Sequence, residues 1–113
     1  MDPDCLFCRI IKGEIPSDKV AETDTVLAFR DIAPKAPTHV LVIPKAHIPD
    51  VPALAAEDAA LMAEMVAVAK QIADAECGGQ FQLAFNTGAD AGQTVFHVHA
   101  HMLGGREIKW DSA

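Results

Sequence analysis

The sequence His97-Val98-His99-Ala100-His101-Met102-Leu103 is the stretch on which the interpretation of the whole chain depends. It holds three of the five histidines, and apolar residues alternate with them. Such alternation predicts a β-strand, in which residues two apart point to the same side. We therefore expect three imidazoles on one face and an apolar layer of Val98, Ala100 and Met102 on the other. The alternative is a strand whose histidines are merely solvated, or are metal ligands by accident of composition.

The segment before this strand, residues 86–94, contains Gly88 and Gly92 and ends with Gln93 and Thr94. A glycine-containing loop offers backbone N–H groups that can surround a phosphate, and Thr94 adds a hydroxyl. A neutral imidazole is a good nucleophile toward phosphorus, and an imidazolium can stabilise phosphate charge or protonate a leaving group. Loop and histidines together predict a phosphate-handling site.

The rest of the chain predicts an α+β domain with two layers. A short helix over 5–12 ends at Gly13, and Ala53–Glu76 has the apolar spacing of a long helix. Strands are expected over 19–22, 25–30, 39–44 and 81–85, whereas the two prolines of 31–37 make that segment a loop. Antiparallel strands with one long helix covering a face satisfy this order of elements.

Composition limits the classes of protein that fit. The chain has 113 residues, which suits a single domain over 1–113. The net charge of −7 argues against non-specific binding to nucleic acid or to an anionic membrane. No apolar run approaches a membrane span, the N-terminus does not resemble a secretory signal, and three cysteines are an odd number for a disulfide framework. A reduced, cytoplasmic setting is the simplest expectation.

The histidine stretch resembles the signature of the histidine-triad (HIT) family of nucleotide-binding proteins. The resemblance extends over nearly the whole chain, and the ending Leu103–Trp110 is similar to the Hint branch, the nucleoside phosphoramidases. Further blocks that resemble the family lie at 5–16, 29–34, 36–47, 86–88 and 91–97.

The resemblance implies a fold and an activity. The fold is an antiparallel five-stranded sheet with one long and one short helix, continued across a homodimer. The activity is hydrolysis of nucleoside 5′-phosphoramidates, or of related acyl nucleotides, to the nucleoside monophosphate. Alternatives within the fold are a dinucleoside polyphosphate hydrolase and a nucleotide-binding scaffold with low turnover.

The resemblance also implies roles for single residues. His99 is the nucleophile that attacks the α-phosphorus and forms a nucleotidyl-histidine intermediate. His101 and Thr94 contact phosphate oxygens and assist the leaving group, and His39 supports the nucleophile from behind. Family members commonly carry serine where Thr94 stands.

The remaining nucleotide contacts follow from the same resemblance. Asp31 binds the ribose hydroxyls, although without the family it reads as an ordinary turn aspartate. His39 likewise reads on its own as a histidine at a strand start. The phosphate side is lined by Asn86, Gly92 and Gln93, and the apolar base slot by Leu6, Phe7, Ile10, Phe29 and Ile32.

A metal site is implied by Cys5-x-x-Cys8. Two thiolates one helical turn apart need two more ligands for tetrahedral zinc. Bacterial-type family members carry a Cys/Cys/His/His zinc site at the positions of Cys5, Cys8, His47 and His97. The alternative is two reduced cysteines packed beside an uncoordinated His47.

Zinc would be structural, with none required for catalysis. A zinc held by all three triad histidines is excluded, because side chains on one strand face span about 13 Å over five residues.

The long helix and the C-terminus bear on assembly. Met62, Met65 and Val66 are expected to form a second apolar face, and family members are homodimers. Trp110 would reach toward the neighbouring subunit's site; otherwise it is a frayed tail residue.

Overall fold

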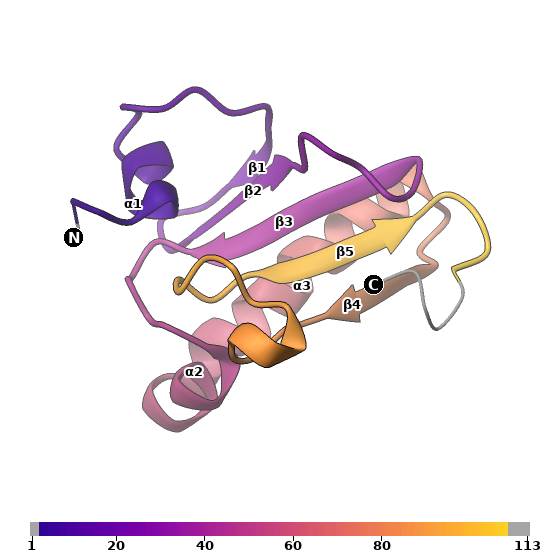
Figure 1. Ribbon diagram of the computed structural model, residues 1–113. Coiled ribbons are helices and arrows are strands. Elements are labelled where there is room, and N and C mark those ends of the chain that lie inside the picture. The colour runs from indigo at the N-terminus through magenta and orange to yellow at the C-terminus, as the bar shows by residue number, and fades with distance from the viewer. Residues whose placement is uncertain (1–2, 109–113) are drawn as a thin grey trace.

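The computed structural model describes residues 3–108. Figure 1 shows α3 running behind the sheet, with α1 near the end where β2 starts and β3 stops. Among the described residues, no helix combines the length and apolar character needed to cross a bilayer. In chain order the elements are α1 (Leu6–Ile11), β1 (Lys19–Glu22), β2 (Val26–Arg30), β3 (Thr38–Pro44), α2 (Val51–Glu57), α3 (Ala59–Glu76), β4 (Phe81–Ala84), the 3₁₀ turn η1 (Ala89–Ala91) and β5 (Ala100–Gly104).

The strands form one five-stranded sheet in the order β1-β2-β3-β5-β4, and every pairing is antiparallel. The predicted α+β class and five-stranded antiparallel sheet are therefore confirmed. Every residue of β3 is buried, because β3 is the central strand and is covered on both sides.

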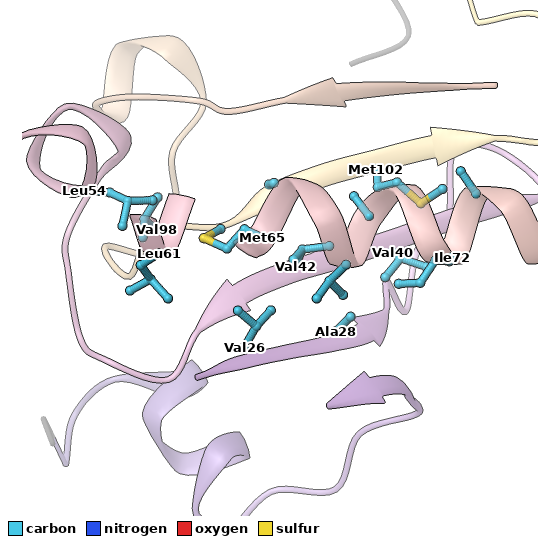
Figure 2. Close-up of a cluster of buried hydrophobic side chains, with 14 of the residues drawn as sticks. Val26, Ala28, Val40, Val42, Leu54, Leu61, Met65, Ile72, Val98 and Met102 are labelled. Carbon is cyan, nitrogen blue, oxygen red and sulfur yellow. The ribbon is translucent and has the colours of Figure 1, made fainter. Parts of the chain in front are cut away.

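The sheet separates two groups of buried side chains. On one face, Val26, Ala28, Val40, Val42, Ala100 and Met102 pack with Leu61, Met65 and Ile72 of α3 (Figure 2). On the other face, Leu27, Phe29, Leu41 and Ile43 pack with Phe7, Cys8 and Ile10 of α1 and with Cys5. Alternate residues of β2 and β3 thus serve different clusters, as the two-residue period of a strand requires.

The helix predicted over Ala53–Glu76 is in fact two helices. The chain breaks at Asp58, whose backbone is not helical (φ −156°, ψ 78°) and whose carboxylate accepts a hydrogen bond from the Leu61 N–H. Asp58 is therefore the N-cap of α3, a role in which aspartate is favoured. Alanine-rich sequence on both sides concealed this break.

The histidine strand is shorter than predicted. β5 begins at Ala100, so His97 and His99 precede the ladder, and the Val98 N–H donates to the Ile48 carbonyl instead (2.7 Å). The alternation of sides is nevertheless kept, because Val98, Ala100 and Met102 all belong to the cluster on the α3 face.

The second apolar face expected on α3 is only partly present. Met65 is 1% exposed and belongs to the core under the sheet, and Met62 is partly buried against the same cluster. Val66 alone is well exposed, at 42%. Trp110 lies outside the described residues.

Candidate active site and metal centre

A cavity of about 920 Å³ opens on the sheet face that carries α1. Its polar part is lined by three histidines, His39, His99 and His101, and by residues of the loop over 86–94. Among the predicted nucleotide-binding residues of the described chain, those that line it are Leu6, Phe7, Ile10, Phe29, Asp31, Ile32, Asn86, Gly92, Thr94, His99 and His101. The structure therefore gathers the predicted phosphate, ribose and base residues around one space.

The orientation of the His99 ring follows from one backbone contact. Its Nδ1 lies 2.9 Å from the His97 carbonyl oxygen, and a carbonyl can only accept. The proton of the neutral ring is therefore on Nδ1, and Nε2 keeps its lone pair. Because His99 is 8% exposed and lines the cavity, the ring is both held and available to a ligand.

The His39 and His101 rings are linked in a second chain of hydrogen bonds. The Lys35 backbone N–H donates to His39 Nδ1 (3.1 Å), so the neutral His39 ring carries its proton on Nε2. That Nε2–H donates to His101 Nδ1 at 3.0 Å. His101 in turn carries its proton on Nε2 and can donate it to a ligand in the cavity.

Burial keeps these linked rings neutral. It lowers the pKa of His101 to about 4, with the neighbouring His99 and His39 adding to the effect. Burial also lowers the pKa of His39, although the Asp31 carboxylate opposes this change. At neutral pH His101 is therefore a hydrogen-bond donor through Nε2 rather than a permanent cation.

Asp31 stands at the edge of this chain. Its Oδ1 accepts from the Ala33 N–H (2.8 Å), and its Oδ2 lies 3.5 Å from His39 Nε2. Asp31 is therefore a turn aspartate, as its position in the sequence indicated, and it also lines the cavity.

Asp31, His39 and His101 also lie close enough together to hold a metal ion. A metal on His39 Nε2 would require the proton to move to Nδ1, where the Lys35 N–H already donates. The existing hydrogen bonds therefore account for this cluster without an ion.

The loop over residues 86–94 is held closed by two side chains. The Asn86 amide donates to the Ala91 carbonyl (2.9 Å), and Gly92 adopts φ 93°, a conformation that favours glycine. Gln93 is 3% exposed: its Oε1 accepts from the Gly88 N–H (2.9 Å) and its Nε2 donates to the Pro49 carbonyl (2.7 Å). Gln93 does not line the cavity, unlike the other predicted phosphate-side residues, and its side chain supports the loop instead.

The apolar wall of the cavity comes from α1 and β2. Phe7 is 4% exposed and meets Phe29 edge to face, with ring centroids 5.6 Å apart. Leu6 and Ile32 are exposed at 44% and 101%, so both present apolar surface that a planar ligand could cover. This wall suits an aromatic ring system such as a base.

The second group of predicted ligands also comes together. Cys5 Sγ lies 3.4 Å from His97 Nδ1, and Cys8 Sγ lies 3.6 Å from His97 Nδ1 and 3.3 Å from His47 Nδ1. Ligands bound tetrahedrally to one zinc lie about 3.6 Å apart when the Zn–S and Zn–N bonds have their usual lengths. The four side chains therefore fit a single tetrahedral ion.

The His97 ring is oriented for such a ligand role. Its Nε2 is 2.8 Å from the Pro44 carbonyl oxygen, so the proton is on Nε2 and the Nδ1 lone pair faces the two sulfurs. Burial lowers the pKa of His97, which keeps the ring neutral, and burial raises the pKa of the Cys5 thiol. A divalent cation would instead favour the thiolate.

Some contributors to the site could not be identified from the sequence. The proton positions depend on the backbone groups of Lys35, Pro44 and His97, and a backbone atom has no residue-type signature. Ile15, Ser17 and Val95 also line the cavity. Their only signal was proximity to predicted elements.

Comparison with known proteins gives consistent matches. The HIT domain family matches residues 12–108. The purine nucleoside phosphoramidase of Escherichia coli K12 is 44% identical over 110 residues, which cover 96% of this chain and 92% of that protein. An uncharacterized HIT-like protein of Synechocystis is 49% identical over 111 residues, 97% of each chain.

A solved structure extends the similarity to three dimensions. The crystal structure of a HIT family hydrolase from Legionella pneumophila superimposes with a TM-score of 0.91 at 45% identity. The match covers 97% of this chain and 100% of that one.

Proposed function

The chain belongs to the HIT domain family, and on that premise we propose that it hydrolyses nucleoside 5′-phosphoramidates to the nucleoside monophosphate and an amine. The observation that carries this proposal is the His99 ring, whose Nδ1–H donates to the His97 carbonyl and leaves a lone pair on Nε2 within the cavity. A neutral imidazole held in this way is poised to attack phosphorus.

The first chemical step is attack of His99 Nε2 on the α-phosphorus. A nitrogen–phosphorus bond forms, the bond to the amino group breaks, and the leaving nitrogen takes a proton from solvent water. His101 Nε2–H and the Thr94 hydroxyl donate to phosphate oxygens and assist that departure. The N–H groups of Gly88, Ala91, Gly92 and Gln93 donate within the loop itself, so the His101 and Thr94 side chains carry the stabilisation of charge.

The second step is hydrolysis of the nucleotidyl-histidine. Water attacks phosphorus and gives up a proton to the solvent, which balances the proton taken in the first step; the bond to His99 breaks and the neutral imidazole is recovered with its proton still on Nδ1. The His97 carbonyl holds the ring during both steps. His39 acts through His101 by fixing which nitrogen of that ring carries the proton.

Substrate binding divides along the cavity. Asp31 would accept hydrogen bonds from the ribose hydroxyls, with Oδ2 the less engaged oxygen. Leu6, Phe7, Ile10, Phe29 and Ile32 would enclose the base through apolar contact. This contact favours a purine, the class named for the Escherichia coli relative, and Asn86 and Gly92 would border the phosphate.

We also propose that Cys5, Cys8, His47 and His97 hold a structural zinc. The support is the set of sulfur–nitrogen distances from 3.3 to 3.6 Å and the orientation of His97 Nδ1. When bound, the ion joins α1 to the sheet. Catalysis uses none of its coordination chemistry, so activity should continue without added metal.

The assembly and location of the protein are part of the same proposal. We expect a cytoplasmic homodimer of single-domain subunits over 1–113, with small nucleotides as ligands and neither nucleic acid nor a membrane as partner. Light scattering at micromolar concentration tests the dimer. A monomer under those conditions would refute it.

The proposed reaction is tested with adenosine 5′-phosphoramidate. The wild-type protein should release adenosine 5′-monophosphate and ammonia, and His99→Ala should lose that turnover while still binding the monophosphate. Turnover retained by His99→Ala would refute the nucleophile. Faster cleavage of a dinucleoside polyphosphate would favour that hydrolase, and binding without turnover of either substrate would indicate a scaffold.

A further inference from the structure

Helix α1 takes part in both sites. Two of the four metal-binding candidates belong to it: Cys5 is its N-cap and Cys8 is its third residue, with Phe7 between them in the sequence. Leu6, Phe7 and Ile10 from the same helix line the cavity. A six-residue helix thus carries half of one site and much of the apolar wall of the other.

Besides the hydrogen bond from His99 Nδ1 to the His97 carbonyl, the ring of Phe7 contacts one residue of each site. Its ring meets His97 edge to face with centroids 5.9 Å apart, and it meets His99 in the same manner at 5.1 Å. The first ring belongs to the metal cluster and the second to the proposed nucleophile. Since Phe7 is 4% exposed, it cannot change position without disturbing these neighbours.

The position of α1 depends on tertiary contacts. A helix of six residues is far below the length of about 12–15 residues at which isolated helices become even marginally stable. The Cys5 side chain caps it by accepting from the Cys8 N–H (3.3 Å), and the metal cluster links it to His47 and His97, which lie far along the chain. Closing that cluster with an ion would fix α1 against the sheet.

The phosphate end of the cavity is built differently. His101 is held in β5, paired with Leu41 of β3, and Asn86 and Gly92 belong to a loop closed by its own hydrogen bonds. None of these supports includes α1. The position of α1 therefore bears directly on the base wall, and on the phosphate site only through the contact between Phe7 and His99.

We propose that metal occupancy and binding of the nucleoside base are thermodynamically coupled through α1, with Phe7 as the positioning residue. Metal binding orders the base wall, and a bound base holds α1 where its two thiols complete the metal site. This inference rests on the proposed function in one respect, namely that the ligand of the cavity is a nucleotide. Coupling between two sites is reciprocal, so each ligand must tighten the other by the same factor.

The test measures the zinc affinity of the wild-type protein by competition with a chromophoric chelator. Measurements are made alone, with saturating adenosine 5′-monophosphate, and with saturating ribose 5-phosphate, which lacks the base. We expect the nucleotide to raise zinc affinity at least about fivefold, the lower end of typical couplings. Ribose 5-phosphate should raise it less than about twofold.

Two reciprocal measurements complete the test. Metal-stripped wild type should bind adenosine 5′-monophosphate more weakly by the same factor. Phe7→Leu, with its circular dichroism unchanged, should keep its zinc affinity and lose the nucleotide effect on it. In the double variant Cys5→Ser/Cys8→Ser, any zinc retained with nucleotide present measures zinc bound by the nucleotide itself. Cys77→Ser is the matched control, because it removes a thiol outside the cluster.

Equal zinc affinity with and without nucleotide would overturn the inference. An equal effect of ribose 5-phosphate would overturn it too, because coupling through global folding does not distinguish the two ligands. If zinc-loaded protein does not bind the nucleotide at all, the proposed function fails instead. If stripped and loaded protein bind it equally well, the function stands and the coupling fails.

Discussion

On the face of the sheet that packs against α3, β5 contributes Ala100 and Met102 to an apolar core, whereas on the opposite face it contributes His101 beside His99. Among residues 3–108, the buried cluster of the first face is apolar, and the partly buried Cys77 packs against it. The second combines buried apolar residues with imidazoles, thiols and a cavity. One strand therefore serves stability and chemistry at once, because its period of two sends alternate residues to different environments.

This division between the faces predicts that the largest effect on stability comes from the α3 face. Met102 is 0% exposed, and Met102→Ala should lower the free energy of unfolding by about 2–5 kcal/mol through lost contact and a cavity. Urea unfolding measures it. Val66→Ala, at a residue 42% exposed, is the control and should stay within about 0.5 kcal/mol. If Met102→Ala lowered the free energy of unfolding by less than about 1 kcal/mol, or changed the turnover per folded molecule, the separation of stability and chemistry between the two faces would be contradicted.

The histidine face predicts a dependence of stability on pH. An unfolded histidine titrates near 6.5, whereas burial and the neighbouring His99 and His39 lower the pKa of His101 to about 4. Between these values the unfolded chain carries the proton and the folded chain does not, so stability must fall as pH falls from 6.5 to 4. For His101 the full loss is of the order of 3 kcal/mol.

Urea unfolding of wild type and His101→Asn across pH 4–7 measures this contribution. The variant should show a smaller slope, with a remainder from His39 and His97, whose pKa values burial also lowers. Parallel curves for the two proteins would show that His101 does not carry the effect.

The supporting histidine predicts a smaller effect, on rate alone. His39→Phe removes the N–H that donates to His101 Nδ1, so the proton of His101 is no longer directed to Nε2. We expect kcat to fall about 10–100-fold, less than the loss of a positioned acid or base itself, with KM nearly unchanged. His39→Gln can restore a donor and should recover part of the rate. If both variants lose the same rate, the loss comes from packing rather than from the hydrogen bond.

The two faces differ in how far the sequence predicted them. The alternation around Ala100 and Met102 identified the face of each side chain even where the ladder ends early, because extended backbone alternates with or without a partner strand. The ladder ends at Ala100 although β3 continues to Pro44, because the Val98 N–H donates to the Ile48 carbonyl, a tertiary contact that the local sequence does not indicate. The break at Asp58 was missed, since alanine-rich sequence favours a helix on both sides and a capping aspartate also suits a helix surface.

For the histidine face, the sequence indicated which residue types lie together but not where their protons are. Spacing and family resemblance indicated His39, His97, His99 and His101, yet the role of each depends on whether a carbonyl or an N–H meets one of its nitrogens. Gln93 was expected beside phosphate and instead supports the loop from within. A polar residue in a glycine-containing loop can face either way, and only packing decides.

The smallest expected effect lies at Thr94, which lines the cavity and has no part in either buried cluster. Thr94→Ser keeps the hydroxyl and removes one methyl group, so the proposed hydrogen bond to phosphate would survive while the cavity gains room beside residue 94. We expect kcat/KM for adenosine 5′-phosphoramidate to change less than about tenfold, equivalent to about 1.4 kcal/mol, and the free energy of unfolding to stay within about 0.5 kcal/mol.

In Thr94→Ser, the rate with a bulkier amine as leaving group should increase more than the rate with ammonia, because the bulkier amine occupies the space that the methyl group leaves. Thr94→Val keeps the shape of threonine without the hydroxyl and should be slower than Thr94→Ser with both substrates. The opposite order would mean that Thr94 acts on this face through shape, as Met102 does on the other, and not through its hydroxyl.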